Sequence, residues 1–363
     1  MTSIDILDIF RAGKIYNPIK GRINRPTLKY RSIEVTVPAR LNAMCFDLKT
    51  LTKPKKKFIY NAGELAFSVN LNTYAKVAIN KNSSEVSITA NTKRKSIVKH
   101  AALIMKDALK IKEGLIVEAN NVYDYPHSGL GSSSSLITAV CVAINEMFGN
   151  PISKRQLSLF ISQNHGEEIN LDDENLIHVQ CNGGSPSVAI YDGGMQIITG
   201  ESNVIFRQDI PNKYTFVFGI PAFYKKVDAQ ALMCIETEQF GDMLKSSNDY
   251  SKEIAWKVLH ELIPAMSNGA MFDIGKIIEY YRFETGSLMI DSVTWNGLYE
   301  LMKELIKMRS KSTPIISVSS CGPAIYVLTT DPNKIQKILE DKGMKTFVSS
   351  PNNDGYNILN TTE

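Results

Sequence analysis

The first third of the chain alternates apolar and polar residues over several short stretches. Between residues 32 and 37, apolar Ile33, Val35 and Val37 alternate with polar neighbours, which predicts a half-buried strand. Similar patterns bounded by turn residues predict further strands at residues 58–60, 66–72, 74–79, 85–89 and 114–120. The first 30 residues carry no comparable pattern, and we expect only a short helix near residues 4–11.

Helical spacing follows in the middle of the chain. Leu136, Val140, Ile144 and Met147 recur at intervals of three or four residues, which predicts a helix buried over much of its surface. Further helices are predicted at residues 97–109, 153–164, 229–240, 253–266, 272–283, 294–308 and 335–342. The helix at 253–266 is expected to turn one apolar stripe inward, formed by Trp256, Leu259, Leu262 and Ile263.

The second half of the chain combines these helices with a second set of strands. Strand patterns occur at residues 214–220, 315–319, 324–329 and 345–349. Strands and helices in this order predict a ferredoxin-like arrangement, with a domain boundary near residues 202–211. The fold class is therefore predicted to be α+β, with two domains.

Composition narrows the class of protein. The chain has 363 residues, of which 44% are hydrophobic and 21% charged, and its net charge is +4, so nothing suggests a nucleic-acid surface. No stretch has eighteen consecutive apolar residues, and we expect a cytoplasmic protein without a membrane partner. The five cysteines show no disulfide or zinc spacing, which favours reduced thiols.

The candidate chemistry centres on a loop of glycines and serines that opens directly onto the helix after residue 135. The backbone N–H groups at a helix start lack intrahelical partners, so such a loop is expected to bind an anion, and we expect that anion to be phosphate. We expect Gly129 and Gly131 to let phosphate oxygens approach the backbone. The predicted phosphate-binding residues are Ser128, Gly129, Leu130, Gly131, Ser132, Ser133, Ser134 and Ser135. A helix cap after a flexible turn is the alternative.

Other candidates lie around this loop in the sequence. Glu167 and Glu168 belong to an acidic stretch that can hold Mg²⁺ together with Ser133, or else form a solvated loop. Arg40 is a candidate for a bidentate contact to phosphate or carboxylate, with a surface ion pair as its alternative, and Asn42 can orient a substrate hydroxyl.

The loop and its surroundings resemble the GHMP kinases, the superfamily of galactokinase, homoserine kinase, mevalonate kinase and phosphomevalonate kinase. Pro126-x-x-Gly129-Leu130-Gly131-Ser132-Ser133-Ser134 resembles the second motif, although it is one residue short, and Pro38-Ala39-Arg40-Leu41-Asn42 resembles the first. The turn Ser320-Cys321-Gly322 resembles the third motif, which implies substrate binding; without the resemblance it is a hairpin.

The resemblance implies a ribosomal-S5-like N-terminal domain followed by the ferredoxin-like domain. The expected division is an N-terminal extension at 1–30, a domain with the phosphate loop at 31–203 and a second domain at 204–363. Most kinases of the superfamily carry a general-base aspartate whose expected position falls near Pro186, where this chain has no carboxylate.

That missing carboxylate, with the order of the motifs, is similar to the β-ribofuranosylaminobenzene 5′-phosphate synthase branch. The branch joins phosphoribosyl pyrophosphate to an aromatic acid and releases pyrophosphate and CO₂. Its chemistry implies Mg²⁺ and a cation for the acid, for which Arg40, Lys225 and Lys226 are candidates. Two departures oppose it: the chain keeps Ser133 and Ser134, as ATP-using kinases do, and it lacks the branch's Arg-x-Asp-Gly-Gly string before Leu65.

Three functions stay open on the sequence. The first is this synthase, and the second is an ATP- and Mg²⁺-dependent kinase of a small alcohol, with Asp47 or the acidic stretch as its base. The third is a non-catalytic protein that binds a nucleotide or phosphorylated ligand. All three have small-molecule partners, and we also allow for a homodimer.

Overall fold

The computed structural model describes residues 8–19, 23–52, 62–123, 125, 127–169, 174–179, 181–224, 229–292 and 295–363. The predicted strand at 58–60, the first half of the helix predicted near 4–11, and Lys225 and Lys226 lie outside these segments. Among the described residues, seven strands form one sheet around two long antiparallel strands, β2 (Ser32–Cys45) and β3 (Glu64–Asn80).

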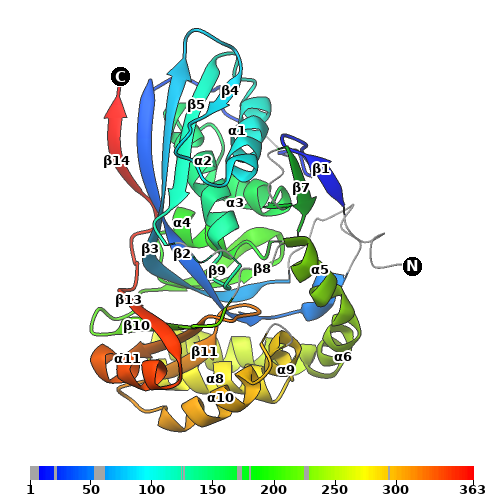
Figure 1. Ribbon diagram of the computed structural model, residues 1–363, viewed down its shortest axis with the longest axis vertical. Helices are drawn as coiled ribbons and strands as arrows, with labels where there is room; N and C mark the ends of the chain where they lie inside the picture. The colour runs from blue at the N-terminus through cyan, green and yellow to red at the C-terminus, as the bar shows by residue number, and fades with distance from the viewer. Residues whose placement is uncertain are drawn as a thin grey trace.

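The remaining strands of this first sheet extend it on both sides. Its order is β14-β2-β3-β5-β4, and β8 pairs with β3 and with β9. These strands are β4 (Val86–Ile88), β5 (Gly114–Asn121), β8 (Met195–Thr199), β9 (Asn203–Gln208) and β14 (Asn357–Thr362). Figure 1 shows β2 and β3 running from the upper domain down toward the lower one.

Strand β2 is longer than its alternating pattern predicted. The expected end at Val37 is wrong, because β2 continues through Pro38 and Arg40 to Cys45. Its register with β3 shifts between Val37 and Ala39, so Pro38, which has no N–H to donate, falls at an irregularity in the ladder. The extension carries Arg40 and Asn42 on a strand instead of a loop.

Four helices of the described segments belong to this domain. They are α1 (Lys95–Leu109), α2 (Ser132–Met147), α3 (Lys154–Gln163) and α4 (Gly184–Ile190). Of these, α1, α2 and α4 contact the sheet, and α3 packs on α2 and α4. Every residue of α2 is buried, as its spacing predicted, and α2 contacts α1, β2 and β3. Apolar residues of these helices and of β2, β3 and β5 form the core of the upper domain.

A small sheet at the side of this domain corrects the expectation for the N-terminal segment. Residues of the expected helix form strand β1 (Ile9–Arg11), which pairs with β7 (Asn175–His178), and β7 pairs with β6 (Gly166–Glu168). Phe10 is buried against the rings of Tyr16 and His100. Tertiary pairing therefore determines the conformation of residues 9–11.

The second domain has the predicted ferredoxin-like sheet. Its four described strands are antiparallel in the order β11-β12-β10-β13, which is the ferredoxin order. They are β10 (Thr215–Pro221), β11 (Ile315–Val318), β12 (Ile325–Thr329) and β13 (Met344–Ser349). The helices are α5 (Ala229–Glu238), α6 (Phe240–Lys257), α7 (Ile263–Ser267), α8 (Met271–Phe283), α9 (Ser287–Asp291), α10 (Leu298–Leu305) and α11 (Pro332–Asp341).

The two sheets share one hydrophobic core. It combines Leu41 of β2, Phe67 of β3 and Leu130 of the glycine-serine loop with Phe216 of β10 and Ile278 of α8. Two strands that the sequence placed in the range 204–363 belong instead to the first sheet: most of β9, and β14, which pairs with β2 at the edge. Figure 1 shows β14 beside β2 at the upper left.

The prediction that one apolar stripe of the helix at 253–266 turns inward is wrong for part of its residues. Leu262 is fully buried, but Trp256 and Leu259 are 53% and 58% exposed. Residues Val258–Leu262 form a π turn between α6 and α7, which rotates the following residues relative to an α-helical stripe. The buried hydrophobic residues of this stretch are Ile254, Val258, Leu262, Ala265 and Met266, so a different face from the expected stripe turns inward.

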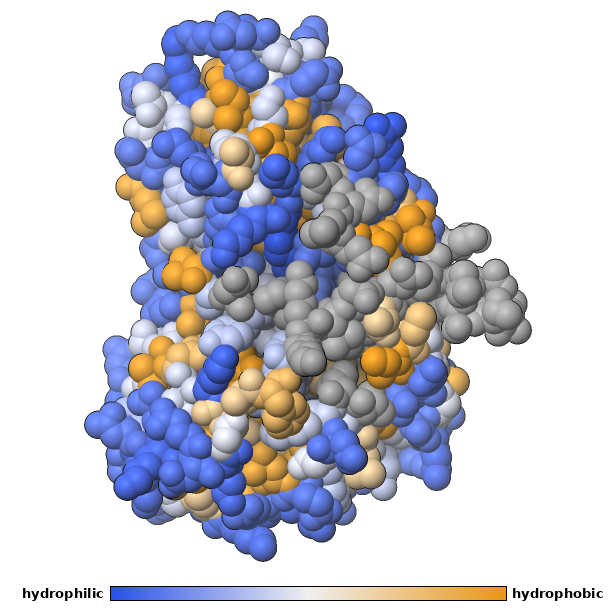
Figure 2. All heavy atoms as spheres, viewed as in Figure 1, coloured by the Kyte–Doolittle hydropathy of each residue, from blue (hydrophilic) through white to orange (hydrophobic). Residues whose placement is uncertain are grey.

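None of the helices in the described segments is both long enough and apolar enough to cross a membrane. On the face shown in Figure 2, apolar groups form separate patches among hydrophilic ones.

Candidate functional site

The glycine-serine loop leads into α2 as the sequence predicted, and its two glycines also lie close to other segments. Gly131 is the N-cap of α2 at a φ of 67°, and a Cβ atom there would lie 2.9 Å from Ser185 Oγ. Gly129 has a φ of 89°, and a Cβ atom there would overlap the backbone carbonyl of Ser319. Both glycines therefore permit close packing against other segments, and the φ values favour glycine at both positions.

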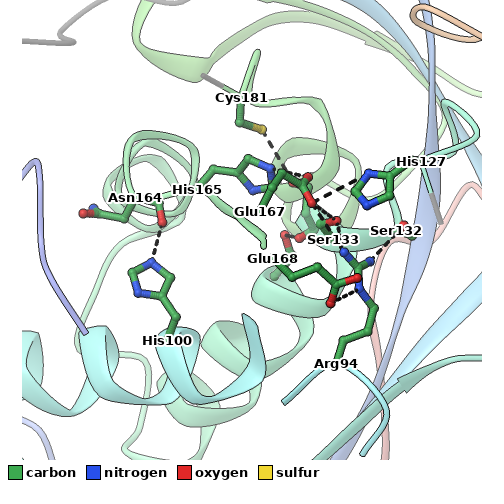
Figure 3. Close-up of polar contacts among 12 residues, drawn as sticks. Arg94, His100, His127, Ser132, Ser133, Asn164, His165, Glu167, Glu168 and Cys181 are labelled. Atoms are coloured by element: carbon green, nitrogen blue, oxygen red, sulfur yellow. Dashed lines mark hydrogen bonds and ion pairs between the residues drawn. The ribbon is translucent and has the colours of Figure 1, made fainter. Parts of the chain in front are cut away.

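The hydroxyl groups that follow the loop meet two acidic residues. Ser133 Oγ donates to Glu167 Oε2 at 2.5 Å. The Arg94 guanidinium donates to Ser132 Oγ (3.1 Å) and Ser133 Oγ (2.7 Å). It also forms ion pairs with Glu167 (3.4 Å) and Glu168 (3.0 Å). Figure 3 shows these side chains converging at the start of α2.

Glu167 is held in its ionised form by this environment. Burial alone would raise its pKa, but the hydrogen bond with His165 and the nearby His127 and Arg94 hold the pKa of the carboxyl well below its usual range. His165 Nε2 lies 3.0 Å from Glu167 Oε1, and His127 Nδ1 lies 4.0 Å from Glu167 Oε2. The site thus presents a permanent carboxylate beside the first turn of α2.

The donor set fits Mg²⁺ shared with a phosphate ligand. A serine hydroxyl and carboxylate oxygens are the hard donors that Mg²⁺ prefers, and Mg²⁺ usually binds one or two carboxylates plus substrate phosphates. The described residues hold no group of three or more His, Cys, Asp or Glu side chains placed to form an all-protein metal cage. Ser133, Glu167 and Glu168, the predicted metal ligands, are brought together by α2 and β6.

Arg40 and Asn42 lie on the other side of the loop and share one carboxylate. Arg40 Nη2 forms an ion pair with Glu64 Oε2 at 2.7 Å, and Asn42 Nδ2 donates to the same oxygen at 2.5 Å. Glu64 is fully buried and Arg40 is 9% exposed, so the alternative of a surface ion pair is wrong, because this ion pair is buried. The positive charge of Arg40 is therefore already paired with Glu64, so it does not face a phosphate or a substrate carboxylate alone.

The turn at Ser320-Cys321-Gly322 packs directly on the loop. Ser319 Oγ donates to the Gly129 carbonyl (2.6 Å), and the Asn42 N–H donates to Ser319 Oγ (3.1 Å). Arg282, which is 2% exposed, donates to the carbonyls of Asn42, Val318 and Ser320. The three segments that resemble superfamily motifs therefore meet, although substrate binding by the turn stays a prediction.

The remaining candidates are placed less centrally. Asp47 Oδ1 accepts from Ser247 Oγ (2.6 Å) and from the Lys49 N–H (3.1 Å), so this carboxylate joins its loop to α6. Each of the five cysteines, all in described segments, is a free thiol. Cys181 Sγ lies 3.5 Å from Ser134 Oγ, and burial raises the pKa of the Cys181 thiol.

Sequence reasoning missed Arg94 and Glu64. Arg94 precedes α1 in a run of charged and polar residues and carries no motif. Glu64 stands at the start of a strongly apolar run, Leu65-Ala66-Phe67, and a charged residue next to such a run was the available signal. Arg94 and Glu167 are 73 positions apart in the sequence, and Arg40 and Glu64 are 24 positions apart. Only the folded chain therefore shows these two pairs.

Comparisons with known proteins match part of the sequence. Residues 96–174 match the family model of the GHMP kinases N terminal domain. A homoserine kinase of Buchnera aphidicola subsp. Schizaphis graminum (strain Sg) is 38% identical over 88 residues, which are 23% of this chain and 24% of that protein. The match thus spans about a quarter of that relative's length.

Solved structures match over nearly the whole fold. The homoserine kinase from Cytophaga hutchinsonii has a TM-score of 0.59 and 18% identity, covering 91% of this chain and 98% of its own. The mevalonate diphosphate decarboxylase from Enterococcus faecalis has a TM-score of 0.62 and 15% identity, covering 91% and 99%.

The chain has the two-domain α+β fold of the GHMP kinases. The family model covers residues 96–174 alone, and the two structural neighbours, at 18% and 15% identity, show the fold. They give no support to the branch expected from the sequence, since the relatives described above are two homoserine kinases and a mevalonate diphosphate decarboxylase.

Proposed function

We propose that this protein is an ATP- and Mg²⁺-dependent kinase of the homoserine kinase type, which phosphorylates a hydroxyl group of a small molecule. The observation that carries the proposal is the 2.5 Å contact between Ser133 Oγ and Glu167 Oε2 at the first turn of α2, beside Gly129 and Gly131. Homoserine kinases occur among both the sequence relatives and the structural neighbours. One matched complex contains AMPPCP and magnesium.

The residues of the site have distinct roles in this proposal. The backbone N–H groups at the start of α2 bind phosphate oxygens of ATP. Ser133 and Glu167 would hold Mg²⁺, which when bound neutralises charge on the phosphates. Arg94, which donates to the loop hydroxyls and pairs with Glu167 and Glu168, holds these groups in place beside the phosphates. Phosphoryl transfer depends mostly on such positioning and electrostatics.

The first experiment measures binding of MgATP by calorimetry and ADP release in the presence of L-homoserine. Ser133→Ala should weaken MgATP binding at least about tenfold, because a hydroxyl ligand is lost. Ser153→Ala is the matched control, since Ser153 also stands at a helix start, where it caps α3 by accepting from the Gln156 N–H. That control should lower stability by about 1 kcal/mol and leave MgATP binding unchanged.

One result would contradict the role of Ser133, and a second would contradict the kinase. Equal MgATP binding by Ser133→Ala and the unmodified protein would show that Ser133 only starts a helix. Binding of phosphoribosyl pyrophosphate with Mg²⁺, without binding of ATP, would favour the pentosyltransferase reaction instead.

A further inference from the structure

Glu64 lies close to the position where the sequence lacks its expected carboxylate. Gly184 begins α4, two residues before Pro186. A Cβ atom on Gly184 would overlap Glu64 Oε1 and lie 2.6 Å from Arg40 Nε. The Glu64 carboxylate from β3 therefore occupies the space beside α4 that a side chain at residue 184 would otherwise enter.

The same carboxylate is connected to the phosphate loop from two sides. Ser185, next to Gly184, places its Oγ 2.9 Å from the Cβ position of Gly131. Asn42, which donates to Glu64, is joined through Ser319 Oγ to the Gly129 carbonyl. Ser185 and Asn42 thus connect the surroundings of the Glu64 carboxylate to the loop that binds phosphate in the proposed function.

These contacts engage only one of the two carboxylate oxygens of Glu64. Oε2 accepts from Arg40 and Asn42, whereas Oε1 is buried and has no hydrogen-bond partner among the described residues. A buried carboxylate oxygen without a partner is costly, so a hydroxyl donor from a bound molecule would satisfy it. Arg40 and Asn42 fix the carboxylate so that this oxygen stays in place.

The other carboxylates placed near the loop or expected there are engaged differently. Glu167 and Glu168 face Arg94 and Ser133, where the proposed Mg²⁺ would bind. Asp47 is held by Ser247 and by the backbone of residue 49. Glu64 is therefore the carboxylate with an oxygen available for a substrate hydroxyl.

We propose that Glu64 is the general base of the reaction and that Arg40 and Asn42 are its positioning residues; this inference rests on the proposed kinase function. The acceptor hydroxyl gives its proton to Glu64 Oε1 as its oxygen bonds to the γ-phosphorus of ATP. The bond from that phosphorus to the β,γ-bridging oxygen breaks, and ADP leaves with the bond's electron pair. General-base catalysis of this kind contributes about 10²–10⁴-fold in rate.

The test uses Glu64→Gln, which keeps the shape of the side chain and removes its basicity. With L-homoserine as acceptor, we expect the single-turnover rate to fall at least about 100-fold, while the Kd of MgATP changes less than about threefold. Glu64→Asp should recover part of the rate. Glu146→Gln is the matched control, because Glu146 is also buried but contacts Tyr356, away from the loop.

Transfer by folded Glu64→Gln within threefold of the wild-type rate would overturn the role of Glu64. If Glu64→Gln unfolds, Arg40→Met combined with Glu64→Gln removes the unpaired buried charge. A folded double variant that binds MgATP but does not transfer supports the base, and one that transfers at the wild-type rate refutes it. Wild-type protein that binds MgATP but never phosphorylates L-homoserine would count against the proposed function itself. The role of Glu64 as general base would then be refuted as well.

Discussion

Gly129 shows how one residue joins the phosphate loop to the second domain. Its φ of 89° is unfavourable for other residues, and an added methyl group would overlap the Ser319 carbonyl, which is backbone and cannot rotate away. We expect Gly129→Ala to lower the free energy of unfolding by about 2 kcal/mol or more. Urea denaturation measures this change.

Gly241 provides the matched control for that substitution. It lies in α6, has an exposed backbone, and a Cβ atom there would meet nothing within 4 Å. Gly241→Ala should leave stability unchanged or raise it by up to about 1 kcal/mol, because alanine favours the helix. Equal effects of the two substitutions would show that the contact with Ser319 does not constrain residue 129.

For single residues, the sequence predicted which positions lie near the site better than it predicted which side chains contact one another. The loop at 128–135 and the acidic residues Glu167 and Glu168 were identified from residue type and local order, since a helix start and a carboxylate pair are local features. The pairing of Arg40 with Glu64 was not, because each residue lies on a different strand and the register of β2 with β3 decides which side chains meet.

Helix α1 depends on a histidine that must stay neutral. His100 Nδ1 accepts the Gly13 N–H (3.0 Å), and its Nε2 lies 2.7 Å from the Asn164 carbonyl, an arrangement that needs a proton on Nε2 alone. Burial lowers the pKa of His100 to about 4, the charge of nearby His165 contributes in the same direction, and the bond to Asn164 opposes it.

This histidine predicts a loss of stability in mild acid. The unfolded chain takes up a proton near the ordinary pKa of about 6.5, whereas the folded protein resists until about pH 4. Stability contributed by His100 is therefore present above pH 6.5 and declines as the pH falls, by about 2 kcal/mol at pH 5. In urea denaturation at pH 7 and pH 5, His100→Gln should lose about that much less than the unmodified protein. The same pH dependence in both proteins would refute this role.

Elements with a strong repeating pattern were predicted best. Helices α1, α2 and α8 and strands β5, β10 and β12 begin and end within a few residues of their predicted bounds. The prediction failed where tertiary contacts dominate, as for β1, which pairs with β7, and at the π turn Val258–Leu262, which interrupts the expected stripe. Strand β14 was missed because all six of its residues are exposed, so no face carries an apolar pattern.

Across the whole molecule, β14 closes the first sheet at β2. Deleting residues 357–363 should remove its hydrogen bonds to residues 32–36 and lower the free energy of unfolding by roughly 1–3 kcal/mol. The freed edge of β2 should also promote association of copies, since unpaired strand edges recruit other strands. Thermal denaturation and sedimentation velocity measure the two effects.

Deletion of Glu363 alone is the control, because it lies beyond β14. That variant should match the unmodified protein in both measurements. If the longer deletion is equally stable and equally monodisperse, then β14 is a dispensable addition to the sheet. Self-association of the unmodified protein in the same sedimentation experiment would also test the homodimer expected from the sequence.

The position of β14 also has a consequence for synthesis on the ribosome. The other strands of the first sheet are complete at Gln208, but β14, which covers the outer edge of β2, begins at Asn357, roughly 150 residues later. At the usual rate of about 5–20 residues per second, the edge of β2 stays uncovered for roughly 10–30 s. During this interval the nascent first domain carries an open edge next to neighbouring chains on the same messenger. A chaperone that covers extended segments would therefore bind this protein most strongly before its last residues emerge.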